Sequence, residues 1–112
     1  MEPVIRKVAD IEPVRSLCGF RQRLIDKTDG FAAGITYLTV NEAECHYHNE
    51  TQEFYYCLEG EGQLRLDDEV VELEPGTLVA IPAGVKHMGM GHFKCLVIGV
   101  PPFDPEDTFD AE

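Results

Sequence analysis

The stretch HYHNETQEFYYCLEG, residues 46–60, holds the side chains that decide the fold. His46 and His48 are two residues apart, so on an extended strand both side chains project from the same face. Glu53 follows His48 at odd spacing, and one unbroken strand would place it on the opposite face. Residues 49–51 are compatible with a turn, and a reversal there would return Glu53 to the side that the histidines face. Two imidazoles and a nearby carboxylate indicate ligands of a divalent metal ion.

A second stretch, GTLVAIPAGVKH, occupies residues 76–87. Its apolar residues 77–81 predict a short strand, and the Pro-Ala-Gly sequence at 82–84 predicts a turn. His87 is then expected on the outgoing strand. Written as patterns, the two stretches are H-x-H-x4-E-x6-G and G-x5-P-x-G-x2-H.

These patterns resemble the two sequence signatures of the cupin superfamily, and the resemblance covers about residues 31–100. It implies an all-β fold, the cupin double-stranded β-helix or jelly-roll barrel. It also places the family's four metal-ligand positions on His46, His48, Glu53 and His87. Three imidazoles and one carboxylate suit Fe(II), Mn(II), Ni(II), Cu(II) or Zn(II). We therefore expect one divalent transition metal as cofactor, with positions left for water, dioxygen or substrate.

The chain departs from the family pattern at two positions. The first signature usually opens with a glycine where this chain has Val40, and the second usually closes with an asparagine where Gly91 stands. Neither position is a metal ligand. We expect Gly91 to leave a polar group missing near the cavity.

A chain of 112 residues is long enough for one domain with a single core. We expect a single cupin domain over residues 1–112, with its core barrel at about 31–100. An N-terminal strand segment, 1–30, would precede the barrel, and an acidic tail, 101–112, would lie on its surface or fray.

Short segments rich in β-branched and aromatic residues, separated by turn residues, favour an all-β barrel or jelly roll. Gly60 is expected to end the strand that begins at Glu53, and residues 88–92 are expected to be a flexible connection. Asp67-Asp68-Glu69 predicts a hairpin turn. The predicted strands are 20–25, 31–40, 54–58, 62–66, 70–73, 77–81 and 93–100.

The net charge of −12 is unevenly distributed, because six of the nine Lys and Arg residues fall within residues 1–30. A surface this acidic repels phosphate backbones and anionic lipid. We therefore expect neither nucleic acid nor a membrane as partner. The charged N-terminus lacks the apolar core of a signal peptide, which predicts a cytoplasmic protein. The four cysteines lack C-x-x-C spacing, and we expect reduced thiols.

Other side chains have two interpretations each. Tyr55 and Cys57 share a face with Glu53 and either line a substrate pocket or pack the barrel interior. Arg21 and Arg23 share a face of the strand at 20–25. That face is either solvated or turned inward, and an inward arginine (we include Arg23 in the candidate pocket) would hold a carboxylate or phosphate.

Two further side chains near these patterns are expected to have no role in the site. His92 is predicted to be a loop or surface residue, and Cys45 is predicted to belong to the core, because it should point away from its neighbour His46.

The resemblance implies either catalysis or ligand binding. In the first hypothesis, the protein is a metal-dependent enzyme of dioxygenase, isomerase or decarboxylase type that acts on a small oxygen-bearing organic molecule, with Glu53 as ligand or base. In the second, it is a small-molecule-binding or sensing cupin without turnover. Relatives often pair edge strands near the N-terminus, so we also expect a homodimer.

Overall fold

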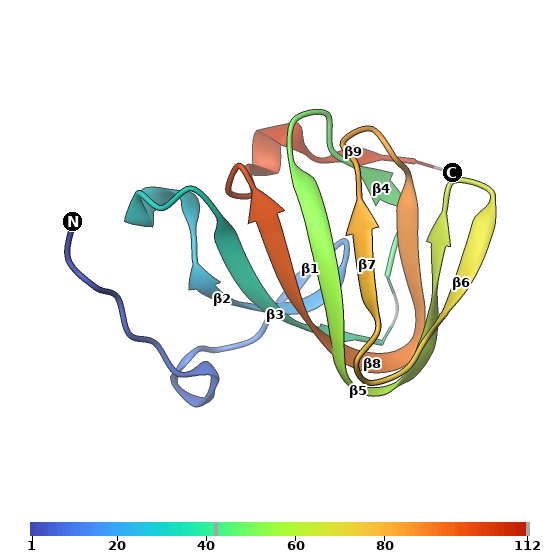
Figure 1. Ribbon diagram of the computed structural model, residues 1–112, viewed down its shortest axis with the longest axis horizontal. Coiled ribbons are helices and arrows are strands. Elements are labelled where there is room, and N and C mark those ends of the chain that lie inside the picture. The colour runs from blue at the N-terminus through green and yellow to red at the C-terminus, as the bar shows by residue number, and fades with distance from the viewer. Residues whose placement is uncertain (42, 112) are drawn as a thin grey trace.

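The computed structural model describes residues 1–41 and 43–111, and the regular elements of these residues are strands and short 3-10 helices (Figure 1). The 3-10 helices are η1 (Val8–Asp10), η2 (Lys27–Asp29) and η3 (Pro105–Asp107). The strands are, in chain order, β1 (Val14–Ser16), β2 (Gly19–Ile25), β3 (Gly34–Val40), β4 (His46–Tyr47), β5 (Gln52–Leu66), β6 (Glu69–Leu73), β7 (Leu78–Ile81), β8 (His87–Val100) and β9 (Phe109–Asp110).

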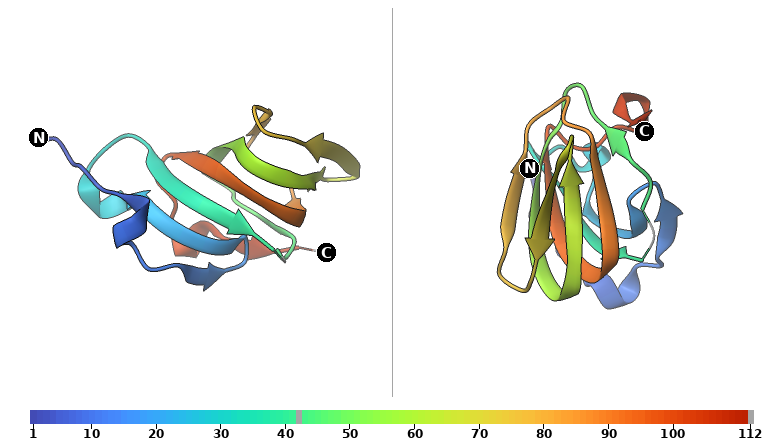
Figure 2. Two further views of the ribbon diagram at one scale, coloured as in Figure 1. Left: turned by 90° about the horizontal axis from the view of Figure 1, so that it is seen from below. Right: turned by 90° about the vertical axis from the view of Figure 1, so that its right-hand side faces the viewer.

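All pairings between these strands are antiparallel, and the long strands β5 and β8 lie at the centre. They pair along their full lengths, from Gln52 opposite Val100 to Leu66 opposite His87. One half of this ribbon is extended by β3, β2 and β1 on one side and by β7 on the other. The other half is extended by β4 and β9 on one side and by β6 on the other. The sheet curls round into a barrel (Figure 2), so the predicted all-β double-stranded β-helix is confirmed.

The two central strands bend together near the middle of their lengths (Figure 1), and Gly60 and Gly91 belong to this middle part of the paired strands. Gly60 has a φ of 88° and Gly91 a φ of 92°, conformations that other residues rarely adopt. A Cβ on Gly60 would also clash with the His92 carbonyl oxygen across the ribbon. The prediction that Gly60 ends its strand is therefore wrong, because the glycine bends β5 and lets it continue to Leu66.

Residues 88–92 are likewise part of β8 and not a flexible connection, since each of them pairs with β5. The predicted hairpin is confirmed, with Leu66 opposite Glu69 and Asp67 at a φ of 52° in the turn. The core between the two halves of the barrel is apolar, and Leu64, Phe93 and Cys95 in it are almost fully buried.

Both ends of the chain pack against the barrel. Near the N-terminus, the Gln22 side chain donates hydrogen bonds to the carbonyls of Val8 and Ile11, and Arg6 forms a bidentate pair with Asp29. At the other end, the tail forms η3 and β9, and β9 pairs with β4. The sequence pattern predicted that the strand at 93–100 is the last one. This prediction is wrong, because β9 follows it. Pairing with β4 requires contacts between residues far apart in the chain, which local patterns do not report.

No helix in residues 1–41 or 43–111 combines the length and the apolar character that crossing a membrane would require. The edge strand β1 pairs only with β2 within the described sheet. The homodimer stays a prediction.

The Arg6–Asp29 pair allows a test of how the N-terminal segment docks. The hydrogen bonds from Arg6, and next that from the Asp26 backbone N–H, lower the pKa of Asp29 to about 2. Arg6→Ala should raise this pKa toward the ordinary value of about 3.9, measured by NMR titration of the Asp29 carboxyl group. Because the folded-state pKa is depressed, the pair stabilises the protein above about pH 4, and this contribution is lost as the pH falls toward 2.

Lys27→Ala is the matched control, because Lys27 lies beside Asp104 and not Asp29. An Asp29 pKa that stays near 2 in Arg6→Ala would show that the N-terminal segment does not dock in this way.

Candidate metal centre

Four buried side chains converge at one end of the barrel. They are His46 on β4, His48 directly after it, Glu53 on β5 and His87 at the start of β8. One potential ligand atom from each lies within 4.8 Å of the others. All four side chains are buried, with exposures of 6% or less. The reversal predicted at residues 49–51 is what brings Glu53 to the face of the histidines.

Each imidazole is oriented by a backbone carbonyl. Nδ1 of His46 lies 2.8 Å from the Glu44 oxygen, and Nδ1 of His87 lies 3.0 Å from the Val85 oxygen. Nδ1 of His48 lies 2.9 Å from the carbonyl of Asp107 in the tail. A carbonyl only accepts, so Nδ1 carries the proton in all three rings and donates it. This leaves Nε2 of each ring available as a ligand atom.

Three buried atoms in the cluster lack hydrogen-bond partners. Nε2 of His48 and Nε2 of His87 each lie 3.0 Å from Oε1 of Glu53. None of these three atoms forms a hydrogen bond with the geometry that such a bond requires, within the described residues. Buried lone pairs of like character repel one another, and burial without a partner is costly. A cation placed among them would satisfy all three atoms. The donor set therefore fits a divalent transition metal, as the sequence predicts.

The pKa values of the cluster agree with this electrostatic picture. Burial is the main cause that lowers the pKa of His46, to about 4, so this ring is neutral at pH 7. Burial would raise the pKa of Glu53, but His48 and His87 beside it lower the pKa to about 2. Burial likewise opposes charge on His48, whereas Glu53 and Asp107 attract a proton and raise its pKa overall. The Glu53 carboxylate thus favours a positive charge beside it, either as a proton on a neighbouring imidazole or as a bound metal ion.

The acidic tail supports the ligands directly. The Asp107 carboxylate accepts hydrogen bonds from the backbone N–H groups of Asn49, Glu50 and Thr51, at 2.9 to 3.3 Å. These residues form the reversal between His48 and Glu53. Because the carbonyl of the same residue holds Nδ1 of His48, one tail residue fixes both the turn and the ring. No sequence signal predicted this role, since Asp107 lies more than fifty positions from its partners.

The two ligand-bearing loops are also joined to each other. The backbone N–H of Gly84, in the turn before His87, donates a 2.6 Å hydrogen bond to the carbonyl of His48. Gly84 has a φ of 86°, which favours glycine there. The separation of His48 and His87 is therefore set by the backbone.

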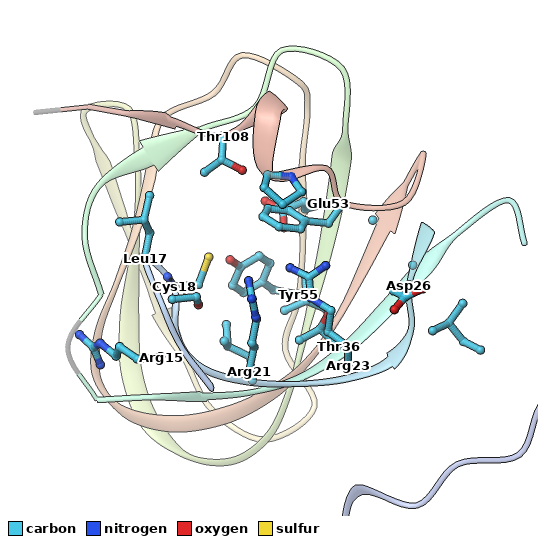
Figure 3. Close-up of a pocket in the computed structure, with 18 of the residues that line it drawn as sticks. Arg15, Leu17, Cys18, Arg21, Arg23, Asp26, Thr36, Glu53, Tyr55 and Thr108 are labelled. Atoms are coloured by element: carbon cyan, nitrogen blue, oxygen red, sulfur yellow. Dashed lines mark hydrogen bonds between the residues drawn. The ribbon is translucent and has the colours of Figure 1, made fainter. Parts of the chain in front are cut away.

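A cavity of about 520 Å³ is lined by Glu53, one of the four candidate ligands (Figure 3). Its floor is made by alternate residues of neighbouring strands, including Arg21 and Arg23 of β2, and Glu53 and Tyr55 of β5. The inward interpretation of the two arginines is therefore the correct one. Cys57 does not line the cavity, because it is 1% exposed and packs in the apolar core. A role in substrate binding for Tyr55 and Arg23 stays a prediction.

One cavity residue that the sequence analysis did not select is Cys18. Its Sγ atom lies 3.0 Å from Nε2 of His46, and in Figure 3 it points toward the Tyr55 hydroxyl. Burial raises the pKa of this thiol to about 12, so it is protonated at pH 7. Burial also raises the pKa of Tyr55 well above its usual range, with Glu53 contributing. Two neutral proton donors therefore lie side by side next to the ligands.

The remaining expectations concern residues around the site. Cys45 is buried, and its Sγ accepts a hydrogen bond from Arg65, so it belongs to the interior and not to the ligand set. His92 is exposed on β8, as predicted. Gly91 removes no polar group from the cavity, which corrects the expectation, because it lies at the bend of the central ribbon, outside the cavity lining.

Comparison with known proteins agrees with this architecture. The sequence model of the family described as "Cupin domain" matches residues 37–93. L-ectoine synthase of Hahella chejuensis is 36% identical over 95 residues, which cover 80% of this chain and 71% of that protein. An uncharacterised protein of Methanocaldococcus jannaschii is 37% identical over 67 residues, or 56% of this chain. This match spans only 54% of the archaeal protein's length.

Solved structures share the fold. A protein from Planctomyces limnophilus superposes with a TM-score of 0.90, at 30% identity and 96% coverage of both chains. The ectoine synthase of P. lautus gives a TM-score of 0.81 at 18% identity, covering 98% of this chain and 91% of that one.

A metal at this site should depend on the buried histidines and not on the exposed one. Purified protein should bind close to one transition-metal ion per chain, and His48→Ala should remove most of it, because one of four ligands and its hydrogen bond to the tail are lost. His92→Ala, which removes an exposed imidazole, should leave the content unchanged. Elemental analysis measures the content. A protein that stays metal-free after reconstitution would exclude the site.

The tail contacts predict a second effect. Asp107→Ala should weaken metal binding by roughly 10- to 100-fold, because the turn at residues 49–51 loses its acceptor. Glu106→Ala is the control, since it removes a neighbouring exposed carboxylate and should change the affinity by less than about twofold. Competition with a chelating dye measures both. Equal affinity of the two variants would show that the tail does not hold the ligands.

Proposed function

This protein belongs to the cupin family, and on that premise we propose that it is a metal-dependent enzyme acting on a small oxygen-bearing organic molecule. The named relatives with this fold include a synthase, a dioxygenase, a nucleoside dehydratase and a decarboxylase. Their names span several reaction types, so the fold does not select one. We place the reaction in the classes open to a mononuclear site of this kind, namely oxygenation, isomerisation and decarboxylation.

One observation carries the proposal: Glu53, a member of the ligand cluster, lines an open cavity, and Nε2 of His48 and of His87 each lie 3.0 Å from its Oε1 atom. A structural metal site is closed by protein ligands, whereas a catalytic one keeps positions accessible to water or substrate. Glu53 is both a candidate ligand and a lining residue of the cavity. A volume of about 520 Å³ also falls in the range of small-molecule sites.

His46, His48, Glu53 and His87 would hold the ion, which supplies Lewis-acid polarisation or activation of dioxygen when bound. The carboxylate of Glu53 has a pKa of about 2, which makes it a weak proton acceptor at neutral pH. We therefore assign Glu53 first to ligation, and a role as catalytic base is the second assignment.

Tyr55 and Cys18 are suited to donate hydrogen bonds, whereas the Glu53 carboxylate can only accept them. Tyr55 is buried and Cys18 half-buried beside the ligands, and both hold their protons at neutral pH, so each can donate a hydrogen bond to an oxygen atom of the substrate. Such donors stabilise negative charge that develops on a carbonyl or hydroxyl oxygen during reaction. This supply of donors favours an enzyme over the alternative, a small-molecule-binding or sensing module without turnover.

The experiment loads the protein separately with Fe(II), Mn(II), Ni(II), Cu(II) and Zn(II). Each form is then tested for oxygen uptake and product formation with catechols, diketones and small organic acids. We expect turnover with one metal, and a loss of at least about tenfold in kcat in Tyr55→Phe at unchanged metal content. Tyr56→Phe is the matched control, because Tyr56 is exposed on the opposite face of β5.

Tight binding of one of these compounds with no turnover under any metal would favour the sensing module. Activity that is unaffected by Tyr55→Phe would leave an enzyme but exclude the hydroxyl as its proton donor.

A further inference from the structure

Arg21 and Arg23 are neighbours on the inward face of β2. Arg21 lies opposite Leu38 and Arg23 opposite Thr36 on β3, and all four residues line the cavity. Figure 3 shows both guanidinium groups rising from β2 toward Tyr55 and Glu53. The intervening Gln22 donates its hydrogen bonds to the N-terminal segment instead. The alternation of the strand thus directs two positive charges to the metal-facing cavity.

Among the residues that the structure describes, the Arg23 side chain is held in place by an aromatic ring and not by a polar partner. Its guanidinium carbon lies 4.3 Å from the centre of the Phe103 ring, so the group stacks on the tail. Its Nε atom is buried and has no hydrogen-bond partner. Burial first, and then the charge of Arg21, lower the pKa of Arg23. Such an arrangement is unfavourable for two cations unless an anion compensates them.

Within the described part of the chain, no carboxylate lies within ion-pair distance of Arg21 or Arg23. The acidic lining residue Asp26 accepts hydrogen bonds from the backbone and hydroxyl of Thr28. Glu53 lies against His48 and His87. The lining holds three arginines and three carboxylates (Asp26, Glu44 and Glu53), so it is less acidic than the chain as a whole, which has a net charge of −12.

We propose that Arg21 and Arg23 bind an oxyanion group of the substrate, a carboxylate or a phosphate, within this cavity. A guanidinium presents its N–H groups in a planar fork that matches two oxygen atoms of such a group. Stacking on Phe103 orients the fork of Arg23 before the ligand arrives, which lowers the entropic cost of binding. The oxyanion assignment rests on the arginines alone, and its assignment to a substrate rests on the proposed function.

The test measures binding of malonate and of inorganic phosphate by isothermal titration calorimetry at low salt. Malonamide, which has the shape of malonate without its charge, is the neutral control. Each compound is titrated into the protein as purified and into protein stripped of metal. The variants are Arg21→Met and Arg23→Met, which remove the charge but keep an unbranched side chain. Lys94→Met is the matched control, because it removes a cation that pairs with Glu59 outside the cavity.

At least one of the two anions should bind, malonamide should not, and each arginine variant should weaken binding by about tenfold or more. Lys94→Met should retain the affinity within about twofold. Preference for malonate identifies a carboxylate substrate, and preference for phosphate identifies a phosphate ester. Failure of both anions to bind, or equal binding by the parent protein and the arginine variants, overturns the proposal.

These outcomes separate the oxyanion site from the proposed enzyme. Arginine-dependent binding to metal-stripped protein supports the oxyanion site even where no metal-dependent turnover exists. Metal-dependent turnover with no contribution from either arginine supports the enzyme and excludes the oxyanion site. Circular dichroism and metal content of each variant confirm that it is folded and retains the ligand cluster.

Discussion

The structure depends on one electrostatic constraint. The Glu53 carboxylate is buried among three imidazoles, and each imidazole already donates a hydrogen bond from Nδ1–H to a backbone carbonyl. A buried carboxylate surrounded by lone pairs requires a positive charge, which can come only from a bound cation or from protons on the rings. The raised pKa of His48 and the lowered pKa of Glu53 are two expressions of this requirement. A divalent metal satisfies it with all rings neutral, and the carbonyls that hold Nδ1 prepare the rings for that role.

The rest of the fold brings these groups together from distant parts of the chain. The bend in β5 and β8 lets one pair of strands serve both halves of the barrel, so β5 carries Glu53 in one half while β8 starts with His87 in the other. A backbone hydrogen bond from Gly84 then joins the loops to one another, and the carboxylate and the carbonyl of Asp107 join them to the tail. The positions of the ligands are thus determined by main-chain contacts and by one side chain of the tail, that of Asp107.

The sequence could predict contacts between residues that are close together in the chain, but not contacts between residues that are far apart in it. Residue spacing was sufficient to bring His46, His48 and Glu53 together, because alternation on a strand and one reversal determine which side chains share a face, whereas His87 was added from the family resemblance. It was also sufficient for the hairpin at Asp67. Spacing failed at Gly60 and at residues 88–92, where glycine suggested an end but close packing of two strands demanded a bend. Asp107 and Cys18 could not be selected, because their partners lie at large separations and no local pattern reports them.

The charges of the cavity complete this account. A metal ion at the ligands and two guanidinium groups on β2 would both present positive charge to the cavity, which the neutral donors Tyr55 and Cys18 also line. A neutral ligand would leave Arg23 as it stands, buried at Nε and repelled by its neighbour. An anionic ligand removes that cost, and in a partly enclosed cavity the gain exceeds that of the same contact at an exposed surface. Discrimination against neutral molecules of equal shape then arises from the unpaired arginines themselves, before any chemistry at the metal ligands begins.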